Sequence, residues 1–169
     1  KEIELNSKFK LQFIVTGSHL SKEFGETYKQ IKLDGFKIDK KIEILNFGNT
    51  NLGITKSIGS GIMQFAKSLK NLNPDIIVIL GDRYEILALA IAALINKIPM
   101  AHIHGGEITE GAFDDSIRHS ITKMSHLHFT SLETYRKRVI QLGENPNLVF
   151  NVGAIGMDGI NKCNLLDKK

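Results

Sequence analysis

Ionisable side chains gather at three points of this 169-residue chain, each beside a glycine and just after an apolar run. The three segments are Gly17-Ser18-His19, Gly81-Asp82-Arg83 and His102-Ile103-His104-Gly105-Gly106-Glu107. Carboxylates and imidazoles transfer protons near neutral pH, and glycine lets a backbone approach a ligand closely. The pattern therefore predicts acid/base chemistry, or the binding of a polar ligand, at these positions.

The position of Asp82 has two interpretations. Its carboxylate either takes part in acid/base chemistry or sugar binding, or it caps the helix that follows, since Asp is a favoured N-cap residue. Arg83 stands beside it at the helix start, where the helix dipole disfavours a cation. We therefore expect Arg83 to face an anion such as a phosphate.

His102 and His104 are two residues apart on a predicted strand, so both should point to the same face. With Glu107 they supply donor types found in metal sites, although such sites usually have a further ligand and supporting hydrogen bonds. The same three side chains also suit acid/base chemistry or hydrogen bonding to one another. The residues alone leave these alternatives open.

A predicted helix brings further ionisable groups close to this region. Asp114 and Asp115 open it, and Arg118 and His119 follow one turn later. At i,i+4 spacing Asp114 and Arg118 would also form an ordinary surface ion pair. Five of the six histidines lie between positions 102 and 128, which is the strongest local bias in the composition.

Apolar patterning predicts strands that alternate with helices along the chain. The expected strands are Lys10–Val15, Lys41–Phe47, Ile76–Leu80, Met100–Ile103, Leu127–Thr130 and Leu148–Val152. Helices are expected after Ser21, from about Ile54 to Leu72, Tyr84 to Asn96, Asp114 to Met124 and Glu133 to Leu142, with a loop at Gly105–Phe113. Ser21 should cap the first helix, with Phe24, Tyr28 and Ile31 on one face.

The alternation predicts an α/β fold, with a Rossmann-like, mostly parallel sheet and helices on both faces. The strand Ile76–Leu80 is uniformly apolar, so we expect it to lie centrally and to be buried on both faces. Sites in such sheets lie beyond the carboxyl ends of the strands. The glycine-flanked ionisable residues are all predicted to lie at that edge.

Composition excludes several classes of protein. Hydrophobic residues make up 42% and charged residues 24%, as in an ordinary globular chain rather than a disordered one. The net charge of +4 favours anionic ligands, but no concentrated basic stripe indicates nucleic acid. The longest apolar run, Ile86–Ile95, is too short to span a membrane. A single cysteine, Cys163, excludes an intrachain disulfide and favours a cytoplasmic location.

Three ordered blocks of this sequence resemble the hydrolysing UDP-N-acetylglucosamine 2-epimerases, which open sialic-acid and related nonulosonic-acid biosynthesis. The blocks are Ile79–Glu85, His102–Glu107 and Asp114–Lys123, and Gly17–Leu20 and Gly25–Tyr28 are similar too. The resemblance covers about Phe9 to Ile160. A Gly-Asp-Arg segment alone would be a weak signal, whereas three blocks with matching spacing are specific.

The resemblance implies one half of a GT-B-like fold, in which a nucleotide sugar binds between two Rossmann-like domains. Residues 1–160 correspond to the N-terminal domain, without its first strand, and 161–169 to a tail or the start of an interdomain linker. The implied partners are a UDP-sugar substrate, the missing C-terminal domain of the same enzyme and further copies in a homo-oligomer. No cofactor, nucleic acid or membrane is implied.

The implied reaction converts UDP-N-acetylglucosamine and water to N-acetylmannosamine and UDP. UDP leaves C1 while a base removes the C2 proton, and water then adds to the resulting acetamidoglucal. The resemblance implies catalytic roles for Asp82, Glu107, Asp114 and His104, and substrate binding by His19, Arg83, His102, Gly105, Gly106, Arg118 and His119. Some relatives carry Glu where this chain has His104, which implies a different operating pH.

Other readings remain open at this stage. His126 and His128 match histidines linked to activity in relatives, but both also suit structural roles. The alternatives for function are the same reaction on a related UDP-diacetamido sugar, a metal-dependent hydrolase using His102, His104 and Glu107, and a non-catalytic half that binds a nucleotide sugar.

Overall fold

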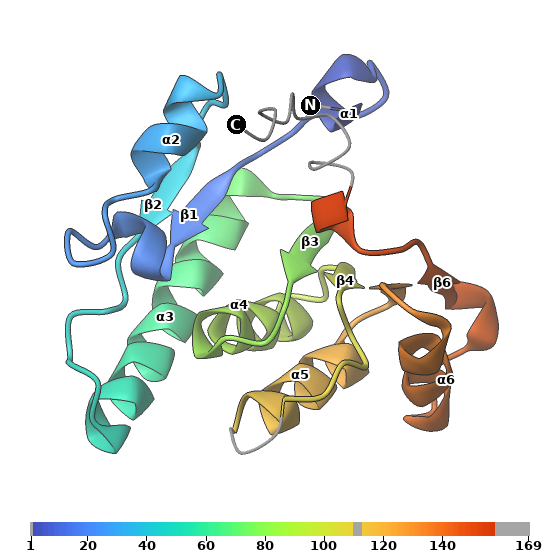
Figure 1. Ribbon diagram of the computed structural model, residues 1–169. Helices are drawn as coiled ribbons and strands as arrows, with labels where there is room; N and C mark the ends of the chain where they lie inside the picture. The colour runs from blue at the N-terminus through green and yellow to red at the C-terminus, as the bar shows by residue number, and fades with distance from the viewer. Residues whose placement is uncertain (1, 110–112, 158–169) are drawn as a thin grey trace, which may run out of the picture.

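A computed structural model describes residues 2–109 and 113–157 of the chain (Figure 1). Its strands are β1 (Ile14–Thr16), β2 (Lys40–Ile42), β3 (Ile77–Leu80), β4 (Met100–Ile103), β5 (Leu127–Thr130) and β6 (Val149–Asn151). Its helices are α1 (Glu2–Leu5), α2 (Tyr28–Leu33), α3 (Asn51–Leu72), α4 (Tyr84–Ile95), α5 (Asp114–Met124) and α6 (Glu133–Gln141), with 3-10 turns η1 (Gly17–Leu20) and η2 (Pro146–Leu148).

All strand pairs are parallel, as the alternation of elements predicts. Strands β1 and β2 form one pair, and β3, β4, β5 and β6 form a four-stranded sheet in that order. In Figure 1, α2 and α3 accompany the β1–β2 pair, and α4, α5 and α6 accompany the larger sheet. The predicted α/β class is therefore confirmed. Because the larger sheet is parallel, the carboxyl ends of its strands share one edge.

The core lies where α3 and α4 pack together against the sheet. Helix α3 begins at the N-cap Thr50, whose hydroxyl accepts from the backbone N–H of Gly53. Gly61 lets α4 approach closely, since a Cβ added there would lie 3.0 Å from the Cβ of Ala88. The middle of α4 is buried, and its buried residues include Ala88, Leu89 and Ala92. The apolar segment at 86–95 therefore packs against the core through most of its length, and only its last two residues are exposed.

The first predicted helix is shorter than expected. Ser21 follows η1 instead of capping a helix, and α2 begins only at Tyr28. Phe24 therefore lies outside the helix and is 51% exposed. The left-handed backbone at Gly25 and at Glu26 interrupts any continuous helix between Ser21 and Tyr28.

The strand at 77–80 is an edge strand of the four-stranded sheet, so the prediction of a central strand buried on both faces is wrong. Ile79 points into the core, but Val78 and Leu80 are 53% and 56% exposed. Strand β3 pairs only with β4 among the described strands, and α4 packs on the Ile79 face. The most buried strand is β4, where Met100 and His102 are 0% exposed and only Ile103 is partly exposed.

Within the described residues, no helix combines the length and the apolar character that crossing a bilayer requires. The predicted tail at 161–169, Cys163 and part of the loop at 105–113 (residues 110–112) lie outside the described residues.

Candidate functional site

The loops after β3 and β4, the end of β5 and the start of α5 meet at the carboxyl edge of the sheet. Arg118 of α5 links two of these segments. Its Nη2 donates to Oδ2 of Asp82, which follows β3, and to Oγ1 of Thr109 at 3.0 Å. Glu107, which follows β4, contacts Ser131 at the end of β5. Strand-end positions far apart in sequence are thus joined into one cluster.

Asp82 and Arg118 form a shielded ion pair. The Arg118 side chain is only 7% exposed and that of Asp82 only 19%. Burial raises the pKa of the Asp82 carboxyl, the Arg118 guanidinium opposes that change, and the negative charges of Asp114 and Glu107 add to it. A carboxyl with a raised pKa exchanges protons closer to neutral pH than an ordinary one does.

The purely structural roles considered for Asp82, as a helix cap, and for Arg118, as a surface ion-pair partner, are both wrong. The N-cap of α4 is Arg83, without a side-chain capping bond, so Asp82 does not cap that helix. The guanidinium of Arg118 is buried and pairs with Asp82, and it also lies 3.9 Å from Asp115, so it does not form an ordinary surface pair with Asp114. Phe113 occupies the N-cap position of α5, and Asp114 and Asp115 lie in its first turn.

Glu107 is held by two donors. Nδ1 of His104 lies 2.5 Å from Oε1 of Glu107, and the Ser131 hydroxyl donates to the same oxygen at 2.7 Å. Burial alone would raise the pKa of the Glu107 carboxyl, but the hydrogen bonds from His104 and Ser131 outweigh it and lower the pKa. Glu107 is therefore a carboxylate that stays ionised at neutral pH.

The loop between His104 and Glu107 has an unusual backbone. His104 has φ +64°, a left-handed conformation that costs a non-glycine residue energy unless its surroundings hold it. Gly106 has φ +79°, and a Cβ there would lie 2.5 Å from the carbonyl oxygen of Tyr135 in α6. Arg138 of α6 donates to the Gly106 carbonyl. Helix α6 therefore fixes the course of this loop.

His102 lies beneath the cluster rather than on its surface. The side chain is 0% exposed, with Nε2 at 2.9 Å from the carbonyl oxygen of Gly81 and Nδ1 at 3.2 Å from Oγ1 of Thr122. A carbonyl can only accept, so Nε2 carries the proton. Burial lowers the pKa of the imidazole to about 4, so the ring is neutral at pH 7. It fixes the turn that carries Asp82, and Gly105 packs beside it, since a Cβ added there would lie 3.1 Å from Nδ1.

The other predicted site residues are more dispersed. Arg83 is largely exposed at its side chain and lies 3.3 Å from the buried Glu85 carboxylate, away from Asp82. His19 bonds to the Thr27 hydroxyl at 2.7 Å on η1. His119 lies 3.5 Å from Asp115 on α5. These contacts do not bring Arg83, His19 or His119 into the central cluster.

The last two predicted histidines differ in burial. His128 is 1% exposed, and its Nε2 lies 3.2 Å from Oε2 of Glu144. His126 is exposed, and its Nδ1 accepts from the backbone N–H of Met100 at 3.3 Å. The contacts of His128 and His126 fit the structural roles that were left open for them.

The three side chains considered as metal ligands, His102, His104 and Glu107, do not point to a common centre. His102 uses both ring nitrogens on Gly81 and Thr122, while Nδ1 of His104 is bonded to Glu107. No group of three or more His, Cys, Asp or Glu side chains suited to a metal ion occurs in the part of the chain that the structure describes.

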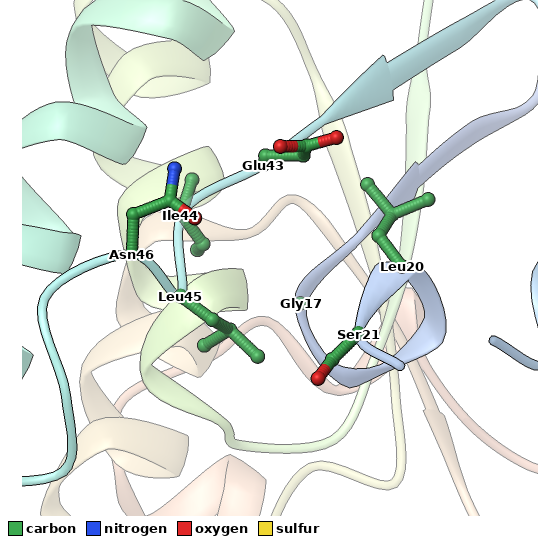
Figure 2. Close-up of a pocket in the computed structure, with 7 residues that line it drawn as sticks. All are labelled: Gly17, Leu20, Ser21, Glu43, Ile44, Leu45 and Asn46. Carbon is green, nitrogen blue, oxygen red and sulfur yellow. The ribbon is translucent and has the colours of Figure 1, made fainter. Parts of the chain in front are cut away.

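A small cavity lies between η1 and the segment after β2 (Figure 2). It has a volume of about 110 Å³ and is lined by Gly17, Leu20, Ser21, Glu43, Ile44, Leu45 and Asn46. Typical small-molecule sites measure about 300–1,000 Å³. The cavity is too small for a whole nucleotide sugar, and neither Asp82 nor Glu107 lines it.

Sequence reasoning did not assign roles to Ser131, Thr109 or Thr122. Ser131 stands at a strand end, so its position placed it near the predicted site. A serine at a strand end is common, however, and nothing in the sequence around it indicated a contact with Glu107. Thr109 and Thr122 act through Arg118 and His102, and such pairings become visible only when the loops are in place.

The whole chain, residues 1–169, matches the family model described as UDP-N-acetylglucosamine 2-epimerase. It is 50% identical to the GDP/UDP-N,N'-diacetylbacillosamine 2-epimerase (hydrolyzing) of Campylobacter jejuni, covering 99% of this chain and 44% of that protein. It is 38% identical to the UDP-N,N'-diacetylbacillosamine 2-epimerase (hydrolyzing) of Legionella pneumophila, covering 95% and 42%.

Solved structures agree with the fold. The structure of UDP-GlcNAc 2-epimerase from Neisseria meningitidis bound to UDP-GlcNAc matches with a TM-score of 0.80 and 21% identity. The match covers 95% of this chain and 42% of that one. The chain thus spans somewhat less than half the length of the relatives it matches.

Proposed function

Because the chain belongs to the UDP-N-acetylglucosamine 2-epimerase family, we propose that its protein is a hydrolysing 2-epimerase of a UDP-2-acetamido sugar. The proposed reaction takes UDP-N-acetylglucosamine and water to N-acetylmannosamine and UDP. The C1–O bond to UDP breaks as the C2 proton is removed, which leaves an acetamidoglucal. Water then supplies the hydroxyl at C1 and a proton returns to C2 on the opposite face.

The observation that carries the proposal is the meeting of Asp82, Glu107 and Arg118 at the carboxyl edge of the parallel sheet. The C2 proton is not adjacent to a carbonyl, so its removal needs a positioned base while positive charge develops at C1. Carboxylates placed in a partly buried cluster supply both the base and the stabilising negative charge.

In this proposal Asp82 and Asp114 exchange protons with the sugar. The raised pKa of Asp82, caused chiefly by burial, suits a group that takes up and returns a proton. Asp114 acts electrostatically on Asp82 from the first turn of α5, and its negative charge helps to raise the pKa of Asp82. His104, paired with Glu107, is a third proton-transfer group at this edge.

The binding roles follow from exposure. Arg83 and His19 are exposed, so we propose that they contact the substrate, whereas Gly105 and Gly106 are buried against His102 and α6 and shape the loop that carries Glu107. Arg118 and His102 are buried, so we propose that they orient Asp82 and its turn rather than grip the sugar. His119, near Asp115, remains a candidate for substrate binding at the open end of α5.

A second substrate is favoured by the relatives. Two of them, at 50% and 38% identity, are named for N,N'-diacetylbacillosamine, a sugar with two acetamido groups. The elimination concerns only C1 and C2, so the same cluster serves either sugar. The choice between them depends on contacts around C4 and C6.

The experiment incubates the full-length protein with each UDP-sugar in deuterated water. UDP release with deuterium at C2 of the N-acetylmannosamine product, or of its diacetamido counterpart, is the expected result. UDP release without C2 deuterium would exclude the elimination, and no release from either sugar would exclude the function. The sugar with the larger kcat/KM identifies the substrate.

A matched pair of variants tests the role of Asp82. Asp82→Asn should reduce kcat by roughly 10²–10⁴-fold, the usual contribution of a general base. Asp75→Asn is the control, because Asp75 is an exposed acid just before the same strand, at the opposite edge. Circular dichroism checks that both variants are folded. An Asp82→Asn enzyme as active as Asp75→Asn would remove Asp82 from the mechanism.

The proposal extends to the whole protein. The relatives are more than twice as long as this chain, which supports a C-terminal domain that completes the nucleotide site. We also propose a homo-oligomer in the cytoplasm, on the strength of the family resemblance and the single cysteine. Light scattering of the full-length protein, and fractionation of the cells that make it, test these two statements.

A further inference from the structure

We propose that Ser131 is a positioning residue whose hydroxyl fixes the Glu107 carboxylate in the orientation that engages His104. This inference rests on the proposed function of the same site and goes beyond it, because Ser131 follows β5 whereas both partners follow β4. It assigns a role in the site to the first residue after β5.

The geometry of the hydrogen bonds supports this role. Ser131 Oγ donates to Oε1 of Glu107 at 2.7 Å, and His104 Nδ1 lies 2.5 Å from the same oxygen. Both contacts therefore converge on one carboxylate oxygen and leave Oε2 to accept from a ligand. Ser131 is 9% exposed, so water competes little for its hydroxyl. Two donors on one oxygen define the plane of the carboxylate better than one does.

The surrounding backbone explains why a side-chain contact is needed. The N–H of His104 donates to the carbonyl of Phe129 at 2.9 Å, and Arg138 donates to the carbonyl of Gly106. These bonds tie the loop to β5 and α6, but they do not touch the Glu107 side chain. Ser131 extends the same attachment from β5 to the carboxylate itself.

The charges around Glu107 set the direction of the effect. His104 and Arg118 favour the ionised carboxylate, and Asp82 is the acidic neighbour across the cluster. The Ser131 hydrogen bond also favours the ionised form and helps to lower the pKa of Glu107. Removal of the hydroxyl should therefore raise that pKa and weaken the His104–Glu107 pair at the acidic end of the pH range.

The test compares three variants of the full-length enzyme. Ser131→Ala removes the hydroxyl, Ser131→Thr keeps it, and Ser125→Ala removes a hydroxyl of similar burial that donates to the Ile121 carbonyl. Ser125 precedes β5 and Ser131 follows it, so the control lies at the opposite edge of the sheet. All three should be folded by circular dichroism.

We expect Ser131→Ala to move the acidic limb of the kcat/KM profile to higher pH. On that limb the loss relative to wild type should reach about tenfold, which corresponds to about 1.4 kcal/mol. Ser131→Thr should restore the wild-type profile, and Ser125→Ala should not change it. A Ser131→Ala profile that coincides with wild type, or a Ser131→Thr profile that resembles Ser131→Ala, overturns the inference.

A second measurement does not depend on turnover. The carboxyl ¹³C resonance of Glu107, in full-length protein labelled at glutamate, reports the titration of this group directly. Its midpoint should be higher in Ser131→Ala than in wild type and in Ser125→Ala. If the wild-type enzyme releases no UDP, the proposed function fails while this titration still decides the role of Ser131. An unchanged midpoint in an active enzyme rejects the positioning role alone.

Discussion

Acidification should destabilise the protein through His102, because burial favours the neutral form of its ring. The side chain is 0% exposed, and burial lowers its pKa from the ordinary 6.5 to about 4. Between these values the unfolded chain holds a proton on His102 that the folded chain does not. The unfolded state therefore binds more protons, and stability is lost as the pH falls through this interval.

The size of the loss follows from the two pKa values. One pKa unit corresponds to about 1.36 kcal/mol, so the interval from 6.5 to about 4 has a limiting value of about 3.4 kcal/mol. With both titrations included, about 1.4 kcal/mol is lost by pH 5.5 and about 3 kcal/mol by pH 4. A loss of this size is a large part of the stability of an ordinary domain, about 5–15 kcal/mol.

The assay is urea unfolding followed by circular dichroism at about pH 7.5, 5.5 and 4, with wild type beside His102→Gln. Glutamine offers an amide donor to the Gly81 carbonyl and an acceptor to Thr122, but it does not titrate. At neutral pH the variant should be the less stable protein, because its amide replaces the ring imperfectly. That deficit should shrink by about 3 kcal/mol on going to pH 4.

A second histidine variant serves as the control for His102→Gln. His19→Gln replaces an exposed histidine whose Nδ1 contacts the Thr27 hydroxyl, a group that can either donate or accept, and it should keep the wild-type pH dependence. A difference between wild type and His102→Gln that stays constant from pH 7.5 to 4 would contradict the assignment of a neutral, buried ring. It would also remove the argument that His102 holds the turn of Asp82 through an Nε2–H donor.

Three further predictions concern neighbouring groups. Arg118→Met should raise the pKa of Asp82 beyond the effect of burial, because the opposing guanidinium is lost, and the acidic limb of kcat/KM should move to higher pH. Gly106→Ala should lower the free energy of unfolding by at least about 1–2 kcal/mol, since its Cβ would lie 2.5 Å from the Tyr135 carbonyl oxygen, and urea unfolding measures this. Burial lowers the pKa of His128 in the folded protein, so wild type should lose stability as the pH falls below 6.5. His128→Gln should lose less stability between pH 7.5 and 5.5, and urea unfolding at these two pH values measures the difference.

Much of the fold is readable from the sequence because strands and helices leave local patterns. The segments at 100–103 and 127–130 coincide with β4 and β5. The error at 76–80 has a different origin. Apolar composition reports that a strand can be buried on both faces, but which faces are covered depends on the order of strands in the sheet. That order is a property of the whole chain.

The site was predictable to the extent that it lies at strand ends. Asp82, His104 and Glu107 stand there, and the structure places them at one edge of the sheet. Their partners were not predictable. Ser131 is 24 residues from Glu107 in sequence, and the two meet only because the loop after β4 lies against the end of β5. Local patterns do not encode a loop conformation that distant hydrogen bonds impose.

The two carboxylates of the cluster have opposite electrostatic environments, and this difference assigns them different tasks. Asp82 has a raised pKa, chiefly from burial, whereas two hydrogen bonds lower the pKa of Glu107 despite its burial. Environments that push the pKa values of paired acids apart separate the group that exchanges protons from the group that stays charged. Under the proposed function, Asp82 exchanges the proton of the sugar, and Glu107 remains an anion that orients His104. An exchange of these roles would require Ser131 and Arg118 to change partners.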